Sequence, residues 1–308
     1  MNKTRIVAVT KALPTYSRDT KDILPFVEVW MKEQDTRFQR KVLKIFEGAA
    51  VDKRYSIMSP EEVFGATSFE EKNNVYIREV KKLGRTVLEQ ALLKSGWSPD
   101  SLDFIITVSC TGIMIPSLDA YLINDLDLRR DIVRLPVTEM GCAAGVSGLI
   151  YARNFLRSNP GKRAAIVAVE SPTATFQLND YSMANVVSAA IFGDGAACVL
   201  VSSEKEATGP RIIHPFLKRN GSSIEKVDHL IFHPGGKKIV ETVENLFGEM
   251  GKDLGDTRET LRLYGNMSSA TVLYVLERFM EKEIPKGEQG LLLSFGPGFS
   301  AQRILLEW

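Results

Sequence analysis

The second half of the chain repeats the pattern of the first half, and this repeat limits the possible fold more than any other feature. In each half an aspartate stands at the start of an apolar strand, Asp103 in the first and Asp228 in the second. A glycine that opens a helix follows later in each half, next to Cys142 and Asn266, which lie 39 and 38 positions after these aspartates. Because strands alternate with helices, the sequence predicts an α/β protein of two pseudo-duplicated halves.

The two halves are expected to differ in length. We assign residues 1–205 to an N-terminal half and residues 206–308 to a C-terminal half. A polar helix over residues 70–95, ending at Gly96, precedes the repeated strand of the first half, but only a short segment stands in its place in the second. A stretch the size of a helix and a hairpin is therefore expected to be missing near residues 213–215. Either the deletion is genuine, or the chain joins segments that are separate in a longer sequence.

Hydrophobic periodicity and turn residues predict the other elements. Helices are expected within residues 17–47, around 118–126 and from Cys142 to about Ser158. Strands are expected at 101–108, 132–137, 164–170 and after a glycine-rich turn that follows Phe192. The strand at 132–137 leads into the corner at Cys142, and its apolar residues predict that it is buried.

Composition excludes several classes of protein. Lysine and arginine number 39 and aspartate and glutamate 38, and no basic stripe carries aromatic residues, so nucleic acid is not an expected partner. No apolar run is long enough for a membrane span, and the first residues lack the pattern of a signal peptide. Three cysteines argue against a disulfide framework, so we expect a reduced, cytoplasmic protein.

Cys142 is the candidate nucleophile. An apolar strand runs into Gly141 and Cys142, and a helix of small and apolar residues follows. Free N–H groups and the helix dipole at such a position favour a thiolate, which attacks acyl carbonyls. The alternative is a small cysteine packed in a glycine- and alanine-rich seam.

Three further turns fall at strand ends that are equivalent in the repeat, and they carry Cys110, His233 and Asn266. Across a pseudo-twofold axis these residues can face Cys142. An imidazole at His233, held in a Pro-Gly-Gly turn, is expected to pair with the Cys142 thiolate and to donate to an acyl oxygen. Asn266 is either a helix cap or a neutral donor to an oxyanion.

Five motifs in this order resemble the type III polyketide synthases of the chalcone synthase family, within the thiolase-fold superfamily. They are Gly-Cys-Ala-Ala-Gly at Cys142, Phe-Gly-Asp-Gly-Ala-Ala from Phe192, His-Pro-Gly-Gly from His233, Gly-Asn-Met-Ser-Ser at Asn266 and Phe-Gly-Pro-Gly from Phe295. The resemblance implies a thiolase fold with αβαβα layers, a homodimer and a catalytic Cys142-His233-Asn266 centre. It also implies iterative decarboxylative condensation of malonyl-CoA onto an acyl-CoA starter held on Cys142, with no metal and no cofactor beyond these CoA thioesters.

The resemblance assigns further roles residue by residue. Phe192 matches an aromatic gatekeeper between the CoA tunnel and the cavity. Cys110 and Thr175 match positions that line the substrate cavity, and Pro297 matches its wall. Ile115 matches a loop that reaches toward the partner's cavity. Contacts to CoA are expected from Lys41, Lys44, Gly235 and Gly236, although the two lysines also suit a solvated helix face.

Departures from the plant pattern guide the choice of substrate. Cys110 stands where plant chalcone synthases have threonine, Ser294 stands where they have glycine, and a second gatekeeper aromatic falls in the missing stretch. The replacement at Cys110 resembles bacterial members, so we expect a fatty-acyl starter and pyrone or resorcinol products. The alternatives are a tetrahydroxynaphthalene-type synthase using malonyl-CoA alone, a carrier-protein-dependent ketoacyl synthase III and an inactive partner subunit. A Gln-Ala-Asn pattern typical of ketoacyl synthase III is missing after the His233 strand.

Overall fold

The computed structural model describes residues 3–65, 67–213 and 224–308. A mixed sheet has the strand order β5-β4-β6-β7-β1-β8-β11-β10-β9, and β2 and β3 form a separate hairpin. The strands of the first half of the sheet are β5 (Val133–Val137), β4 (Phe104–Val108), β6 (Arg163–Glu170), β7 (Gly195–Ser202) and β1 (Arg5–Ala12). Those of the second half are β8 (Arg211–Ile213), β11 (Ser300–Glu307), β10 (Gln289–Gly296) and β9 (His229–Phe232).

The two halves share one pairing pattern. In the first half β4 is parallel to β6, and β6, β7 and β1 are antiparallel in turn. In the second half β9 is parallel to β10, and β10, β11 and β8 are antiparallel in turn. The repeated aspartates make equivalent contacts, because Asp103 accepts a bond from the N–H of Arg163 at 3.0 Å and Asp228 from that of Gln289 at 2.7 Å. These two acceptor residues therefore tie each loop to the first residue of the neighbouring strand.

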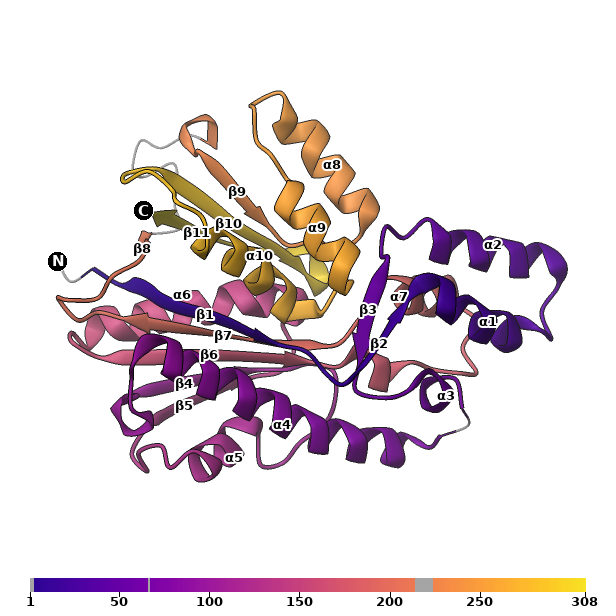
Figure 1. The fold of residues 1–308 in the computed structure, drawn as a ribbon, viewed down its shortest axis with the longest axis horizontal. Helices are drawn as coiled ribbons and strands as arrows, with labels where there is room; N and C mark the ends of the chain where they lie inside the picture. The colour runs from indigo at the N-terminus through magenta and orange to yellow at the C-terminus, as the bar shows by residue number, and fades with distance from the viewer. Residues whose placement is uncertain (1–2, 66, 214–223) are drawn as a thin grey trace.

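The two halves of the sheet form two layers. Helices lie between these layers and on both outer faces, as Figure 1 shows. The central helices α6 (Ala144–Ser158) and α10 (Thr271–Met280) pack against strands of both halves. The outer face of the first half is covered by α4 (Phe69–Ser95) and α5 (Leu118–Asp125), and that of the second by α8 (Lys237–Gly248) and α9 (Gly255–Tyr264). This αβαβα arrangement confirms the predicted thiolase fold.

A smaller region extends from one end of the layers (Figure 1). It contains the β2–β3 hairpin and several helices: β2 (Tyr16–Asp19), β3 (Lys53–Ser56), α1 (Thr20–Met31), α2 (Thr36–Glu47), α3 (Pro60–Val63) and α7 (Met183–Ile191). The expected helix within 17–47 is confirmed from Thr20 onward, but it is interrupted. Asp35 starts α2 by accepting bonds from the N–H groups of Arg37 and Phe38, and residues 17–19 belong to β2.

The predicted helix over residues 70–95 is confirmed and is well capped. Ser68 and Glu71 form a reciprocal capping box at its start, and Gly96 ends it with a φ of 69°. Among the described residues, the second half has no helix of this kind before β9. The predicted missing stretch near 213–215 runs into residues 214–223, which lie outside the described part of the chain.

The prediction of a buried strand at 132–137 is wrong. β5 is an edge strand that pairs only with β4 within the described sheet, and Val133 is 46 % exposed. Apolar residues alone cannot distinguish a central strand from an edge strand whose outer side meets another surface. Among the helices described, none has the length and apolar character needed to cross a membrane.

Candidate active site

Cys142 lies in a one-turn 3-10 helix, η2 (Gly141–Ala143), directly before α6. The second half of the chain holds this turn in place. Ser294 on β10 donates a hydrogen bond to the Cys142 carbonyl oxygen at 2.7 Å. Gly141 has a φ of 52°, and a Cβ there would lie 2.7 Å from Pro297, so both the conformation and the close contact require glycine.

Asn266 has a fixed side-chain orientation beside the thiol. Its oxygen accepts bonds from the N–H of Ser268 at 2.8 Å and the hydroxyl of Thr271 at 3.3 Å. The thiol of Cys142 lies 4.0 Å from the same oxygen, and the NH₂ group donates to the carbonyl of Gly235 at 3.3 Å. Because the oxygen is already occupied, the NH₂ group is the part of Asn266 left to bind a substrate oxygen.

His233 directly follows β9 and is only 2 % exposed. Its backbone N–H donates to Leu293 at 3.0 Å, but neither ring nitrogen has a hydrogen-bond partner within the described parts of the chain. Burial lowers the pKa of His233 to about 3. The imidazole is therefore neutral near pH 7, and its single N–H is a donor that no described group uses.

The expected ion pair between Cys142 and His233 is wrong for this structure. No hydrogen bond joins the two side chains within the described residues, and burial raises the pKa of the Cys142 thiol. The hydrogen bonds between the thiol and Ser268 and Asn266 act in the opposite direction but do not compensate. Loss of hydration therefore outweighs the position before a helix, and both groups rest in the neutral form.

A chain of polar groups links the thiol to a buried carboxyl group. Ser268 Oγ lies 3.7 Å from Cys142 Sγ and 3.6 Å from Cys110 Sγ. The Cys110 thiol lies 3.6 Å from each carboxyl oxygen of Glu170, which also accepts bonds from the Cys110 N–H at 3.0 Å and from Ser269 Oγ at 2.5 Å. Burial raises the pKa of Glu170 and raises that of Cys110 to about 12. The thiol of Cys110 is therefore protonated at neutral pH.

Sequence reasoning missed Glu170 and Ser268 as members of the site. Glu170 is a carboxylate at the end of the otherwise apolar strand β6, which is a signal that could have been used, because buried carboxyl groups are rare without a function or partners. Ser268 belongs to a motif that was recognised, yet its contacts with both thiols depend on η6 (Ser268–Ala270), which only the fold reveals.

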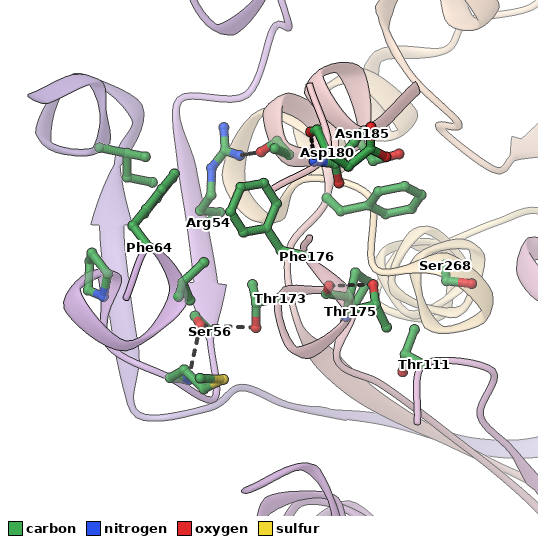
Figure 2. Close-up of a pocket in the computed structure, with 18 of the residues that line it drawn as sticks. Arg54, Ser56, Phe64, Thr111, Thr173, Thr175, Phe176, Asp180, Asn185 and Ser268 are labelled. Carbon is green, nitrogen blue, oxygen red and sulfur yellow. Dashed lines mark hydrogen bonds between the residues drawn. The ribbon is translucent and has the colours of Figure 1, made fainter. Parts of the chain in front are cut away.

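A cavity of about 510 Å³ opens beside these groups. Figure 2 shows Thr111, Thr175 and Ser268 at one end and Phe64 at the other, with Phe176 between them. The predicted residues Cys110, Thr175 and Phe192 line the cavity. Phe192 follows α7, whose last carbonyls, of Ala189 and Ala190, accept bonds at 2.7 and 2.9 Å from the buried guanidinium of Arg54.

The remaining predicted residues lie outside the described cavity wall. Pro297 contacts Gly141, and Ile115 is 91 % exposed in the loop before α5. Lys41 and Lys44 are exposed on α2.

Gly235 and Gly236 form the turn between His233 and α8. Gly236 has a φ of 151°, which favours glycine. The carbonyl of Gly235 receives the bond from the NH₂ group of Asn266. This turn therefore lies beside the proposed donor groups, while its contact with CoA stays a prediction.

Comparison with known proteins gives a consistent result. The family model "Chalcone and stilbene synthases, N-terminal domain" matches residues 1–205, and the model of the C-terminal domain of the same family matches residues 211–307.

Two curated relatives illustrate the match. A phloroglucinol synthase of Pseudomonas fluorescens is 28 % identical over 308 aligned positions, covering 86 % of this chain and 88 % of the relative. A 1,3,6,8-tetrahydroxynaphthalene synthase of Streptomyces coelicolor is 30 % identical, covering 86 % and 82 %. The alignment with the phloroglucinol synthase is 308 positions long but includes only 86 % of the 308 residues of this chain. Some of its positions are therefore residues of the relative that have no counterpart here.

A solved structure agrees over nearly the whole chain. The crystal structure of 1,3,6,8-tetrahydroxynaphthalene synthase from Streptomyces coelicolor A3(2), described as a bacterial type III polyketide synthase, superposes with a TM-score of 0.92. The match covers 99 % of each chain at 26 % sequence identity.

Proposed function

Because the chain belongs to the chalcone and stilbene synthase family of type III polyketide synthases, we propose that Cys142 carries an acyl starter that malonyl-CoA extends. In the loading step the sulfur of Cys142 attacks the carbonyl carbon of an acyl-CoA. The bond from that carbon to the CoA sulfur breaks, and CoA leaves with the proton of the Cys142 thiol. The product is an acyl thioester on the enzyme, in line with covalent catalysis by a cysteine.

Extension follows on the same thioester. The thioester carbonyl of malonyl-CoA binds to the N–H of His233 and the NH₂ group of Asn266. Carbon dioxide leaves, and the electron pair of the broken bond forms an enolate whose oxygen these two neutral donors stabilise. The enolate carbon attacks the acyl carbon on Cys142, the carbon–sulfur bond breaks, and a β-ketoacyl-CoA is released for the next cycle.

The observation that carries this proposal is the unused donor of His233 beside Asn266, whose NH₂ group keeps a second N–H after its bond to Gly235. The imidazole of His233 is buried and neutral and has no described partner, and Asn266 is oriented by Ser268 and Thr271. A buried polar group without a partner costs about 1–3 kcal/mol, so its retention beside the thiol supports a role in binding a substrate oxygen. Because His233 and Asn266 are neutral, they can bind the developing negative charge of the enolate oxygen without first breaking an ion pair with another group.

The cavity supports a fatty-acyl starter. Several of its polar side chains already bond within the protein: Thr175 donates to Pro172, Ser56 donates to Thr173, and Arg54 donates to α7. Large apolar side chains also line the cavity, among them Met58, Phe64 and Phe176. We therefore propose extension of an alkyl chain, followed by cyclisation to pyrones or resorcinols.

A second candidate uses malonyl-CoA as both starter and extender. It is favoured by the relatives, which are named for phloroglucinol and tetrahydroxynaphthalene, hydroxylated aromatic rings without an alkyl chain. The two candidates share the chemistry at Cys142 and differ only in what fills the cavity.

We also propose a cytoplasmic homodimer that uses CoA thioesters without a further cofactor. The exposed edge of β5 and the apolar side chains of Ile113 and Ile115 support the dimer, because such an edge is normally covered. The lysines at 41 and 44 are proposed as contacts to CoA phosphates.

Product analysis by liquid chromatography and mass spectrometry tests these proposals. The protein is supplied with malonyl-CoA, alone and with acyl-CoA starters of increasing length, and is compared with Cys142→Ala. Alkylated products that grow in two-carbon units and vanish in Cys142→Ala would support the fatty-acyl proposal. Products from malonyl-CoA alone, unchanged by added starters, would favour the second candidate, and no product under any condition would contradict both.

A further inference from the structure

The far end of the cavity is closed by a wall of aromatic rings. Phe64 and Phe176 line the cavity, with their ring centres 5.3 Å apart. Trp30 packs behind them, 4.9 Å from Phe176 in an edge-to-face arrangement and 6.2 Å from Phe64. In Figure 2, Phe64 stands at the end of the cavity away from Ser268. These three rings therefore stand between the cavity and what lies beyond it.

Beyond this wall lies an outer groove, which we call the α1 groove. It has a volume of about 550 Å³ and is bounded by α1 and residues 178–181. Its lining is mostly apolar, with three charged residues and one amide at the rest of the wall: Pro25, Phe26, Val29, Trp30, Leu178 and Tyr181, with Lys32, Glu33, Glu61 and Asn179. Phe64 lines both this groove and the cavity, so the same ring borders the two spaces.

The α1 groove is suited to an alkyl chain. Val29 is 67 % exposed there, and Trp30 already uses its indole N–H in a 2.7 Å bond to the carbonyl of Leu178. The stacked ring of Tyr181, 5.8 Å from that of Trp30, adds a further apolar surface. Apolar surface of this kind gains free energy when an alkyl chain removes it from water.

Phe64 is the least buried of the three rings in the wall. Phe176 and Trp30 are 7 % and 6 % exposed, and each is enclosed by the core. Phe64 is only half-buried and sits at the end of the one-turn helix α3, held by a backbone bond to Pro60 at 2.9 Å. Rotation of this side chain joins the two spaces without unfolding any longer element.

We propose that Phe64 is a gate within the starter-binding path, and that the tail of a long alkyl chain passes it into the α1 groove. Short acyl chains end inside the cavity, whereas a chain that extends beyond Phe64 displaces the ring of this residue. This inference rests on the proposed fatty-acyl starter and specifies where the end of that starter lies. It assigns to Phe64 and Val29 the discrimination between chain lengths.

Binding to the Cys142→Ala protein tests the inference without requiring turnover. Affinities for hexanoyl-CoA and palmitoyl-CoA are measured by calorimetry in this background, with and without Val29→Glu. A carboxylate at Val29 is exposed, so the fold tolerates it, but it opposes an alkyl tail in the groove. We expect at least tenfold weaker binding of palmitoyl-CoA and a change below twofold for hexanoyl-CoA. Leu93→Glu, on the 85 % exposed Leu93 of α4, is the matched control and should change neither affinity.

Variants of the gate give a second measurement. Phe64→Ala should raise the preference for palmitoyl-CoA over hexanoyl-CoA severalfold, and Phe64→Trp should lower it. Palmitoyl-CoA affinity that is the same in Val29→Glu and Leu93→Glu would overturn the inference, as would unchanged preferences in both Phe64 variants. If palmitoyl-CoA binds in the expected Val29-dependent way but no starter is ever extended, the gate stands and the proposed function fails.

Discussion

Phe192 and Asn266 form an isolated parallel β-bridge, which ties the cavity wall to the proposed donor of the active site. The N–H of Asn266 donates to Ile191 at 2.8 Å, and the N–H of Gly193 donates to the carbonyl of Asn266 at 3.1 Å. Arg54 also holds the end of α7, through bonds to the carbonyls of Ala189 and Ala190. A change in the backbone at either bridge residue therefore moves both the aromatic ring and the carboxamide.

Gly193→Ala is expected to disturb this bridge. A Cβ at Gly193 would lie 2.5 Å from the carbonyl oxygen of Tyr264, so the backbone must shift. We expect malonyl extension to fall about tenfold or more, because small misplacements of catalytic groups cost factors of up to about 100. Gly248→Ala, where nothing lies within 4 Å, is the control and should retain full activity in steady-state assays. Equal activity of the two variants would mean that the bridge does not position Asn266.

Asn266→Ala should separate the two half-reactions. Removal of one oxyanion donor typically costs about 10²–10³ in kcat, so release of carbon dioxide from malonyl-CoA should fall by this factor. Loading of Cys142 should change only a few-fold, since the donors act on the malonyl oxygen. Carbon dioxide release and acyl-enzyme mass are measured in parallel, with the exposed Asn159→Ala as control. A loss confined to loading would contradict the assigned role.

The raised pKa of Cys142 predicts how its reactivity changes with pH. At pH values below this pKa, the fraction of Cys142 present as thiolate rises tenfold per pH unit. Alkylation of Cys142 by iodoacetamide should therefore accelerate steadily from pH 6 to pH 9. Ser268→Ala removes a hydrogen bond that lowers the pKa, and should slow alkylation at each pH. His233→Ala should leave the profile unchanged. If the alkylation rate instead reached a plateau near neutral pH, and this plateau disappeared in His233→Ala, the result would show that Cys142 and His233 form a thiolate–imidazolium pair.

Asp194 should make stability depend on pH. It is buried and accepts bonds from the N–H groups of Ile57 at 2.8 Å and Thr173 at 3.0 Å, and burial raises its pKa to about 7. The folded state therefore binds a proton that the unfolded state releases above about pH 4. The contribution of Asp194 to the free energy of unfolding is therefore fully present below pH 4 and is lost as the pH rises toward 7.

This loss is measurable by comparison with Asp194→Asn, which cannot titrate. Between pH 4 and pH 7 the free energy of unfolding of the natural protein should fall by about 1.4 kcal/mol per pH unit relative to Asp194→Asn. Urea unfolding at several pH values provides the measurement. Parallel pH dependences of the two proteins would show that Asp194 has an ordinary pKa in the folded state.

Much of the fold could be predicted from local signals in the sequence. The capping residues of α4, the aspartates at 103 and 228 and the β-branched strands are local features, and each led to a correct element. The burial of β5 could not be predicted correctly, because Val133 has the same apolar character in an edge strand as in a central one. Position within a sheet depends on the whole topology.

The site could be predicted as a set of residues but not as an electrostatic state. The motifs identified Cys142, His233 and Asn266, and the fold brings Cys142 within 4.0 Å of Asn266. The pKa of Cys142 depends on burial by residues from both halves, which no local pattern records, and this burial opposes the expected thiolate. The path past Phe64 was likewise invisible, since it joins α1, α3 and the chain after η3 (Pro172–Thr175).

Intact mass spectrometry of the enzyme after incubation with an acyl-CoA tests the central claim most directly. Without malonyl-CoA, the account predicts a mass increase of one acyl group, located by peptide analysis on Cys142 and absent in Cys142→Ala. Addition of malonyl-CoA should remove this label while carbon dioxide and a β-ketoacyl product form. A label on Cys110 in place of Cys142, no label at all, or a label that survives malonyl-CoA would contradict the account.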